Sequence, residues 1–208
     1  SYINYFNFLN IFNYLTFRTG GAILTSLFFS LIFGQTIINY LSSFQPSGQP
    51  IRQDGPESHI IEKAGTPTMG GLLILSSILF SVLLWARLTN IFIWITLLSC
   101  FSFGLIGFID DYKKIISQKS TGLTASTRII FQILISFLII FLIYSYLPES
   151  YNTKLNFPFL KNFVFDLGLF FFPFGIFLII GSANAVNLTD GLDGLAIVPV
   201  MIVALSFG

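Results

Sequence analysis

Five apolar stretches of nineteen or twenty residues limit the folds open to this chain of 208 residues. They cover residues 22–41, 70–88, 91–109, 129–147 and 167–186, and a further apolar run begins at Leu195. An α-helix needs about 20 apolar residues to cross the hydrocarbon core of a bilayer. Only 9% of the residues are charged, whereas a soluble domain carries roughly 25%. The sequence therefore predicts an all-α, polytopic transmembrane helix bundle with five complete spans and part of a sixth.

The domain organisation follows from these spans. We expect residues 1–208 to form a single transmembrane domain. The chain opens on Ser1 rather than Met, and its last apolar run continues to Gly208, so we expect a longer protein that is truncated here at its C-terminus. The single cysteine, Cys100, lies within a span and excludes an internal disulfide. A net charge of +1 gives no reason to expect a nucleic-acid partner.

The few charged residues gather in three polar clusters, which we define as residues 49–71, 110–114 and 184–194. These clusters hold seven of the nine acidic residues. Charge beside a bilayer is costly, so carboxylates gathered at membrane edges usually mark a site of chemistry or transport. The clusters are therefore the candidate functional regions of the chain.

The spans also predict the orientation of the loops. Because successive spans cross the membrane in opposite directions, loops 42–69, 110–128 and 187–194 lie on one face of the membrane. That face carries six Lys and Arg residues, and the other carries four. The positive-inside rule assigns the first face, with all three clusters, to the cytoplasm. On the opposite side we expect residues 148–166 to form an ordinary interfacial loop.

The second cluster closes the third span with two adjacent carboxylates, Asp110 and Asp111, followed by Lys113 and Lys114. At a helix C-terminus each carboxylate opposes the helix dipole, at a cost of about 0.3–1 kcal/mol. One interpretation is structural: the lysines lie three and four residues after Asp110 and fold back as ion pairs. The other is a metal site, with Mg²⁺ held by both carboxylates and by phosphate oxygens of a substrate. The pair alone does not decide between them.

The third cluster has a regular spacing of polar residues. Asn184, Asn187, Asp190 and Asp193 recur at every third position, and helical backbone would align much of this set. Gly191 permits close approach of a ligand. A polar turn before the sixth helix is the alternative, but four aligned polar groups exceed what a turn requires.

The first cluster ends in the run Thr66-Pro67-Thr68-Met69-Gly70-Gly71, with Lys63 just before it. Thr66 followed by Pro67 predicts the N-cap and first residue of the second span. A helix N-terminus presents free N–H groups that suit an anion such as phosphate, and Lys63 adds positive charge. This cluster is thus a candidate phosphate-binding segment.

Together the clusters resemble the phospho-N-acetylmuramoyl-pentapeptide transferase (MraY) family, part of the superfamily of polyprenyl-phosphate N-acetylhexosamine-1-phosphate transferases. The resemblance rests on residues 59–71, on the Asp-Asp-x-x-Lys pattern at 110–114 and on Asn-Leu-Thr-Asp-Gly-Leu-Asp-Gly at 187–194, in the family's order. The wider superfamily typically has Asp in place of Lys114, so this chain is similar to the peptidoglycan branch.

The resemblance implies a ten-helix enzyme of the bacterial cytoplasmic (inner) membrane with a cytoplasmic active site. The implied reaction moves phospho-MurNAc-pentapeptide from UDP-MurNAc-pentapeptide to undecaprenyl phosphate, forming lipid I and UMP in peptidoglycan synthesis, with Mg²⁺ as cofactor. It makes Asp110 and Asp111 the catalytic and metal-proximal pair. The residues implied at the nucleotide and diphosphate site are Lys63, Thr68, Asn187, Asp190, Gly191, Leu192 and Asp193. The family's later metal ligand and histidine-rich loop would fall beyond Gly208.

Two other functions stay open, as does the oligomeric state, for which a homodimer is one option. A sister transferase that moves GlcNAc-1-phosphate from UDP-GlcNAc to a polyprenyl phosphate shares the Asp-Asp pair and the lipid acceptor. An ion-coupled transporter would place its charges near mid-span, in broken helices. The spans of this chain are almost free of charge, which disfavours the transporter.

Overall fold

The computed structural model describes residues 7–45, 48, 66–118, 121–156, 164–189 and 195–207. Within these ranges the chain folds into six α-helices, two short 3₁₀-helices and one two-stranded sheet, which confirms the predicted all-α class. The chain divides into two compact units, Ser1–Ala125 and Ser126–Gly208.

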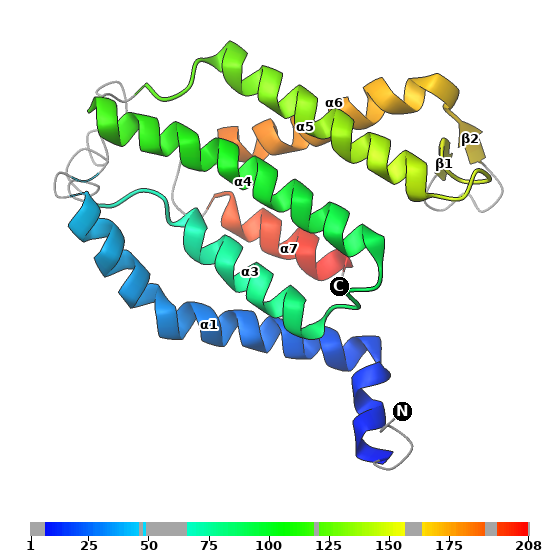
Figure 1. The fold of residues 1–208 in the computed structure, drawn as a ribbon, viewed down its shortest axis with the longest axis horizontal. Helices are drawn as coiled ribbons and strands as arrows, with labels where there is room; N and C mark the ends of the chain where they lie inside the picture. Colours follow the sequence, from blue (N-terminus) through cyan, green and yellow to red (C-terminus); the bar gives the residue numbers. More distant parts are fainter. Residues whose placement is uncertain are drawn as a thin grey trace. The chain divides into compact units, whose positions relative to one another are not determined.

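The elements are drawn in Figure 1. The first unit contains η2 (Asn7–Asn13), α1 (Leu15–Phe44), α3 (Gly71–Trp85) and α4 (Ile91–Ser117). From α5 onward the elements are α5 (Ala125–Tyr146), β1 (Lys154–Asn156), β2 (Val164–Asp166), η3 (Gly168–Phe170), α6 (Phe171–Thr189) and α7 (Ile197–Phe207). The helices α1, α3, α4, α5 and α6 correspond to the five predicted spans, and α7 to the partial sixth.

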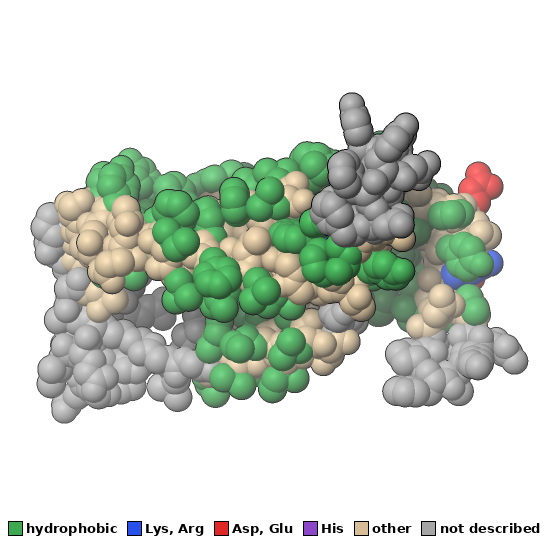
Figure 2. Space-filling model, turned by 90° about the horizontal axis from the view of Figure 1, so that it is seen from below, with side chains coloured by type: hydrophobic (Ala, Val, Ile, Leu, Met, Phe, Trp, Pro, Cys, Tyr) green, Lys and Arg blue, Asp and Glu red, His purple; other side chains and the backbone are tan. Residues whose placement is uncertain are grey.

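Four of the described helical segments are long and apolar enough to cross a membrane: Leu15–Phe44, Ile91–Ser117, Ala125–Tyr146 and Gly168–Thr189. The second predicted span forms the shorter helix α3, whose 15 residues extend about 22 Å at 1.5 Å per residue. Hydrophobic side chains are spread over much of the face shown in Figure 2, where few charged side chains are in view. An apolar exterior of this kind belongs in lipid, so the chain is a multi-pass membrane protein.

Helices α1 and α3 pack against each other along a polar and small-residue seam. Near the start of α1, the Arg18 Nε donates to the Trp85 carbonyl oxygen at 2.6 Å. A Cβ at Gly21 would lie 2.5 Å from the Trp85 ring, so only glycine permits this contact. Ser81 Oγ donates to the Ala22 carbonyl oxygen at 2.7 Å. Because the start of α1 meets the end of α3, the two helices are antiparallel and their register is fixed.

Helices α3 and α4 approach closely where Gly104 meets Leu75, since a Cβ at position 104 would lie 2.5 Å from Leu75 Cδ1. The helices are joined by a short turn, and the Asn90 side chain caps α4 by accepting from the Phe92 N–H at 3.0 Å. Thr68 precedes Leu75 by seven residues, and Asp111 follows Gly104 by seven. The contact between these antiparallel helices therefore brings Thr68 and Asp111 to the same end of the unit.

In the second unit, α5 and α6 are joined by a polar contact and a close approach. Asn184 Nδ2 donates to Gln132 Oε1 and to the Ile180 carbonyl oxygen, each at 2.9 Å. Gln132 is buried on α5, and a Cβ at Gly175 would collide with Ile140. Interhelical amide contacts of this kind commonly hold membrane helices together. Asn184, the first residue of the third polar cluster, therefore serves helix packing.

The loop between α5 and α6 contains an antiparallel hairpin that the sequence analysis missed. Strand β1 pairs with β2, with Leu155 opposite Phe165. Asp166 Oδ1 accepts a hydrogen bond from Thr153 Oγ1 at 2.6 Å and another from the Gly168 N–H at 2.9 Å. The Thr153 hydroxyl and, next, the Gly168 amide hold the pKa of Asp166 below its ordinary value.

Thr153→Val is expected to raise the pKa of Asp166 towards that of an ordinary aspartate, because the largest cause of its lowering is removed. A lowered pKa stabilises the fold above the unfolded-state pKa, and this contribution is lost as pH falls through the folded-state pKa. Carboxyl ¹³C NMR titration measures the shift, with Thr153→Ser as the control that keeps the hydroxyl. An identical Asp166 titration in Thr153→Val and wild type would show that the hydroxyl has no such role.

Candidate functional site

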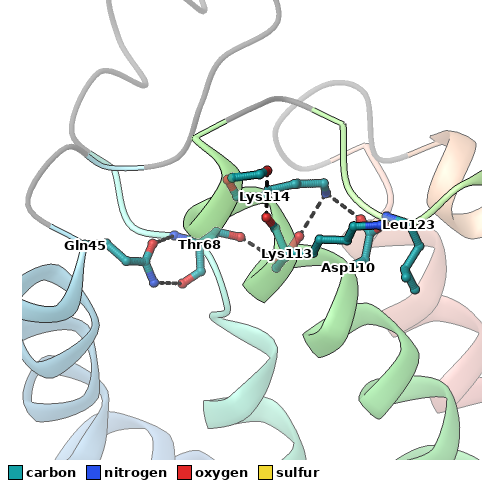
Figure 3. A network of polar contacts seen from close by, with 8 residues as sticks. Gln45, Thr68, Asp110, Lys113, Lys114 and Leu123 are labelled. Carbon is teal, nitrogen blue, oxygen red and sulfur yellow. Dashed lines mark hydrogen bonds and ion pairs between the residues drawn. The ribbon is translucent and has the colours of Figure 1, made fainter.

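The two adjacent carboxylates of the second polar cluster lie on α4 and share one lysine. Lys114 Nζ lies 2.6 Å from Asp110 Oδ2 and 3.0 Å from Asp111 Oδ1. These are i, i+4 and i, i+3 pairs, the spacings at which side chains on one helix meet. The predicted ion pairing is thus confirmed for Lys114, which offsets the repulsion between the two carboxylates (Figure 3).

The prediction that this pair closes its helix is wrong. Helix α4 continues to Ser117 and ends at Gln118, which adopts a left-handed conformation with φ of 52°. Ser117 Oγ also donates to the Lys113 carbonyl oxygen at 2.8 Å. Asp110 lies about two turns before the end, and the dipole effect fades beyond the last turn. The extra turns remove the expected penalty and place Lys114 beside both carboxylates.

Thr68 is joined directly to Asp111. Its Oγ1 donates to Asp111 Oδ2 at 2.7 Å, a contact between residues 43 positions apart. The resemblance had implied both residues at the site, and the structure brings them together. Asp111 is consequently held on one oxygen by Thr68 and on the other by Lys114.

The predicted helix start at Thr66 and Pro67 is wrong, because α3 begins at Gly71 and its N-cap is Gly70. Met69 has a φ of 72°, in the left-handed region, so the backbone before Gly70 is not continuous with the helix. Such a conformation costs a residue other than glycine about 1–3 kcal/mol and persists only where surrounding contacts hold it. The non-helical turn is what aims the Thr68 hydroxyl at Asp111.

Gln45 is a site residue that the sequence analysis missed. It directly follows α1 and is 4% exposed. Its Oε1 accepts from the Thr68 N–H at 2.9 Å, and its Nε2 donates to the Thr68 carbonyl oxygen at 3.3 Å. The sequence shows only a glutamine shortly after an apolar span, which is a weak indication of a role in the site.

The segment that follows α4 contacts Asp110. The Leu123 N–H donates to Asp110 Oδ1 at 2.7 Å. Gly122 lies so close that an added Cβ would collide with the Asp110 carboxyl group and its backbone oxygen. This role of Gly122 was also missed, because a glycine in a polar connection has many ordinary explanations.

The chemistry of the carboxylate pair suits a divalent cation. The side chains of Asp110 and Asp111 are 15% and 28% exposed, so a small ion can reach them. Their contacts include Lys114 on both carboxylates, the Leu123 N–H on Asp110 and the Thr68 hydroxyl on Asp111, and an ionised carboxylate offers about four lone-pair sites. The described residues contain no cluster of three or more His, Cys, Asp or Glu side chains. Two carboxylates nevertheless fit Mg²⁺, which commonly takes one or two from the protein and the rest from phosphate and water.

The remaining predicted site residues are placed as follows. Asn187 lies near the end of α6 in the second unit and is exposed. The other five, Lys63, Asp190, Gly191, Leu192 and Asp193, lie outside the described residues. The structure thus brings together Thr68, Asp110 and Asp111 from the predicted set, and adds Gln45, Gly122 and Lys114 to their surroundings.

Comparison with known proteins gives two matches. The family model described as Glycosyl transferase family 4 matches residues 93–208, which is more than half of the chain. This region includes both carboxylates and Asn187. The motif described as Phospho-N-acetylmuramoyl-pentapeptide-transferase signature 1 matches residues 63–75. That motif contains Lys63 and Thr68.

Proposed function

Because this chain belongs to glycosyl transferase family 4 and is a membrane transferase, we propose a specific reaction for it. It transfers phospho-MurNAc-pentapeptide from UDP-MurNAc-pentapeptide to undecaprenyl phosphate and forms lipid I and UMP. The single observation that carries this proposal is the Thr68–Asp111 hydrogen bond. It links the segment matched by the phospho-N-acetylmuramoyl-pentapeptide-transferase signature to the carboxylate pair in the region matched by the family model.

Asp110 and Asp111 are the residues to which we assign the chemistry. In direct transfer, one carboxylate takes a proton from the lipid phosphate, whose oxygen bonds to the sugar-bearing phosphorus of the donor. The bond from that phosphorus to the UMP oxygen breaks, and UMP leaves with the electron pair. In a covalent route, a carboxylate oxygen bonds to that phosphorus first, as the bond to the UMP oxygen breaks and UMP leaves, and the deprotonated lipid phosphate oxygen then bonds to the phosphorus and displaces the carboxylate. Both routes need an oriented carboxylate, which Thr68 and Lys114 provide for Asp111.

Mg²⁺ is part of the proposal. Held by Asp110 and Asp111, it would neutralise negative charge on the donor diphosphate. Lys63 and the residues at Asn187, Asp190, Gly191, Leu192 and Asp193 are proposed to bind the nucleotide and diphosphate, as the resemblance implies. Their amide, carboxylate and ammonium groups offer the donors and acceptors that such a ligand needs.

We also assign the site to the cytoplasmic face of the inner membrane. The loops that carry the polar clusters have the larger share of Lys and Arg, and the positive-inside rule supports that orientation. On that face the water-soluble nucleotide sugar arrives from the cytoplasm, and the lipid phosphate arrives laterally at the depth of the headgroups. The reaction thus takes place where the two substrates can meet.

The proposed donor is tested by competition. Membranes that contain the full-length protein are given Mg²⁺, undecaprenyl phosphate and equal amounts of UDP-MurNAc-pentapeptide and UDP-GlcNAc, and the lipid product is identified by mass spectrometry. We expect the diphospholipid of MurNAc-pentapeptide, with no product when undecaprenyl phosphate is omitted. A product that carries only GlcNAc would instead establish the sister reaction. If neither lipid product forms, the proposed reaction is wrong.

A further inference from the structure

We propose that Gln45 is a positioning residue of this transferase, which acts on Asp111 through Thr68. This inference rests on the proposed function for its kinetic consequence, but its structural part is independent of it. Gln45, Thr68 and Asp111 form a continuous chain of hydrogen bonds from the end of α1 to α4 (Figure 3). No pattern in the sequence connects Gln45 to the carboxylate pair.

The first link is a two-point contact between a side chain and a backbone. The Gln45 amide accepts from the Thr68 N–H at 2.9 Å and donates to the Thr68 carbonyl oxygen at 3.3 Å. An apolar side chain at position 45 would leave both backbone groups without these partners, in a place where Gln45 itself is only 4% exposed. Buried backbone groups without partners are disfavoured. Gln45 is thus matched to the Thr68 backbone rather than merely adjacent to it.

The second step is that Thr68 needs an external support. The next residue, Met69, is held in the left-handed region at φ of 72° and is 8% exposed. Residues in that region keep their conformation only where several neighbouring contacts enforce it. On the helix side, the Met69 carbonyl oxygen accepts a hydrogen bond from the Leu72 N–H of α3 at 3.0 Å. Gln45 supplies contacts on the other side of Met69.

Gln45 is itself well anchored. Its N–H donates to the Ser42 carbonyl oxygen at 3.2 Å at the end of α1, and its own carbonyl oxygen accepts from the Gly48 N–H at 2.9 Å. The seam between α1 and α3, in which Ser81 binds the Ala22 carbonyl oxygen, fixes the register of the two helices. The position of the Gln45 amide is therefore set by α1, not by the turn that it holds.

The last link reaches the reacting group. Thr68 Oγ1 donates to Asp111 Oδ2 at 2.7 Å, while Lys114 holds the other oxygen. A shift of the Thr68 backbone by a fraction of an ångström would lengthen this bond and let the carboxylate rotate about its contact with Lys114. Gln45 thereby sets the orientation of Asp111 without touching it.

The proposal is tested with Gln45→Met, which keeps the shape of the side chain and removes the amide. We expect kcat of the full-length protein to fall about ten- to a hundredfold, the range associated with misplacement of a reacting group by about 1 Å. The matched control is Gln35→Met, because Gln35 lies on α1 but is exposed and bonds to Asn39. We expect this control to retain wild-type turnover. Turnover of Gln45→Met within about twofold of wild type would overturn the proposal.

A double-mutant cycle separates positioning from general destabilisation. In a Thr68→Val background, which lacks the hydroxyl, Gln45→Met should lower kcat by less than about threefold, because the link to Asp111 is already broken. A merely structural role predicts that the two substitutions multiply. Full multiplication of the two effects would overturn the role through Thr68.

A readout independent of turnover accompanies the kinetics. Hydrogen–deuterium exchange of the peptide that contains Thr68 should be faster in Gln45→Met than in wild type and in Gln35→Met, since the Thr68 N–H loses its acceptor. Unchanged exchange would overturn the first link. If the wild-type protein transfers a phosphosugar from neither donor, but hydrogen–deuterium exchange at Thr68 is faster in Gln45→Met, the proposed reaction is wrong and the structural role of Gln45 stands.

Discussion

Asp111→Asn is expected to lower turnover of the full-length enzyme by about two to four orders of magnitude, and Asp110→Asn by a similar factor. Asparagine keeps the shape of aspartate but removes the charge and the ability to take a proton. Each substitution also leaves one carboxylate beside Lys114 instead of two, which weakens the attraction of the site for a divalent cation. This change removes a base, a nucleophile and an anionic metal ligand, so the prediction does not depend on which route operates.

The measurement is the initial rate of UMP release in membranes at saturating donor and lipid phosphate, normalised to the amount of protein. Asp166→Asn is the matched control, since it makes the same substitution at an exposed carboxylate in the β1–β2 hairpin. We expect this variant to keep the wild-type rate. Rates close to wild type in both Asp110→Asn and Asp111→Asn would remove the catalytic assignment.

Gly122→Ala is expected to lower turnover by about ten- to a hundredfold. A Cβ at this position would lie 2.6 Å from Asp110 Cγ and 2.8 Å from the Asp110 backbone oxygen. Neither atom can yield easily, because the backbone belongs to α4 and the carboxylate is held by Lys114. The segment after α4 must move away instead. It then loses the bond from the Leu123 N–H to Asp110.

The control for this prediction is Gly20→Ala, because Gly20 lies on α1 and a Cβ there meets nothing within 4 Å. Alanine also favours helix over glycine by about 1 kcal/mol, so this variant should be at least as stable as wild type. Turnover and thermal stability are measured for both variants. Wild-type turnover in Gly122→Ala would show that the contact with Asp110 does not matter for the reaction.

Two features that depend on residues close in the sequence were predicted correctly: the apolar spans and one ion pair. The spans follow from runs of apolar residues, which are local in the sequence. The pairing of Lys114 with Asp110 follows from a spacing of four residues on a helix. The family resemblance, carried by three motifs in order, agrees with the matches over residues 93–208 and 63–75.

Features set by tertiary contacts could not be predicted in this way. Local capping rules favoured a helix start at Thr66, but the contacts of Gln45 and Asp111 hold Thr68 outside the helix. Hydropathy ended the third span at residue 109, whereas α4 continues to Ser117 because helix formation does not stop where polar residues begin. The Gln45–Thr68 contact joins residues 23 positions apart, and no spacing rule detects it.

UMP release offers the most direct test of the central claim, that the Asp110–Asp111 cluster transfers a phosphosugar to a lipid phosphate. Purified full-length protein is given Mg²⁺ and UDP-MurNAc-pentapeptide, with and without undecaprenyl phosphate, alongside the Asp110→Asn/Asp111→Asn double variant. We expect steady UMP release by the wild type that requires the lipid phosphate, and none above background by the double variant. Lipid-dependent release that the double variant retains would show that the chemistry resides outside the Asp110–Asp111 cluster.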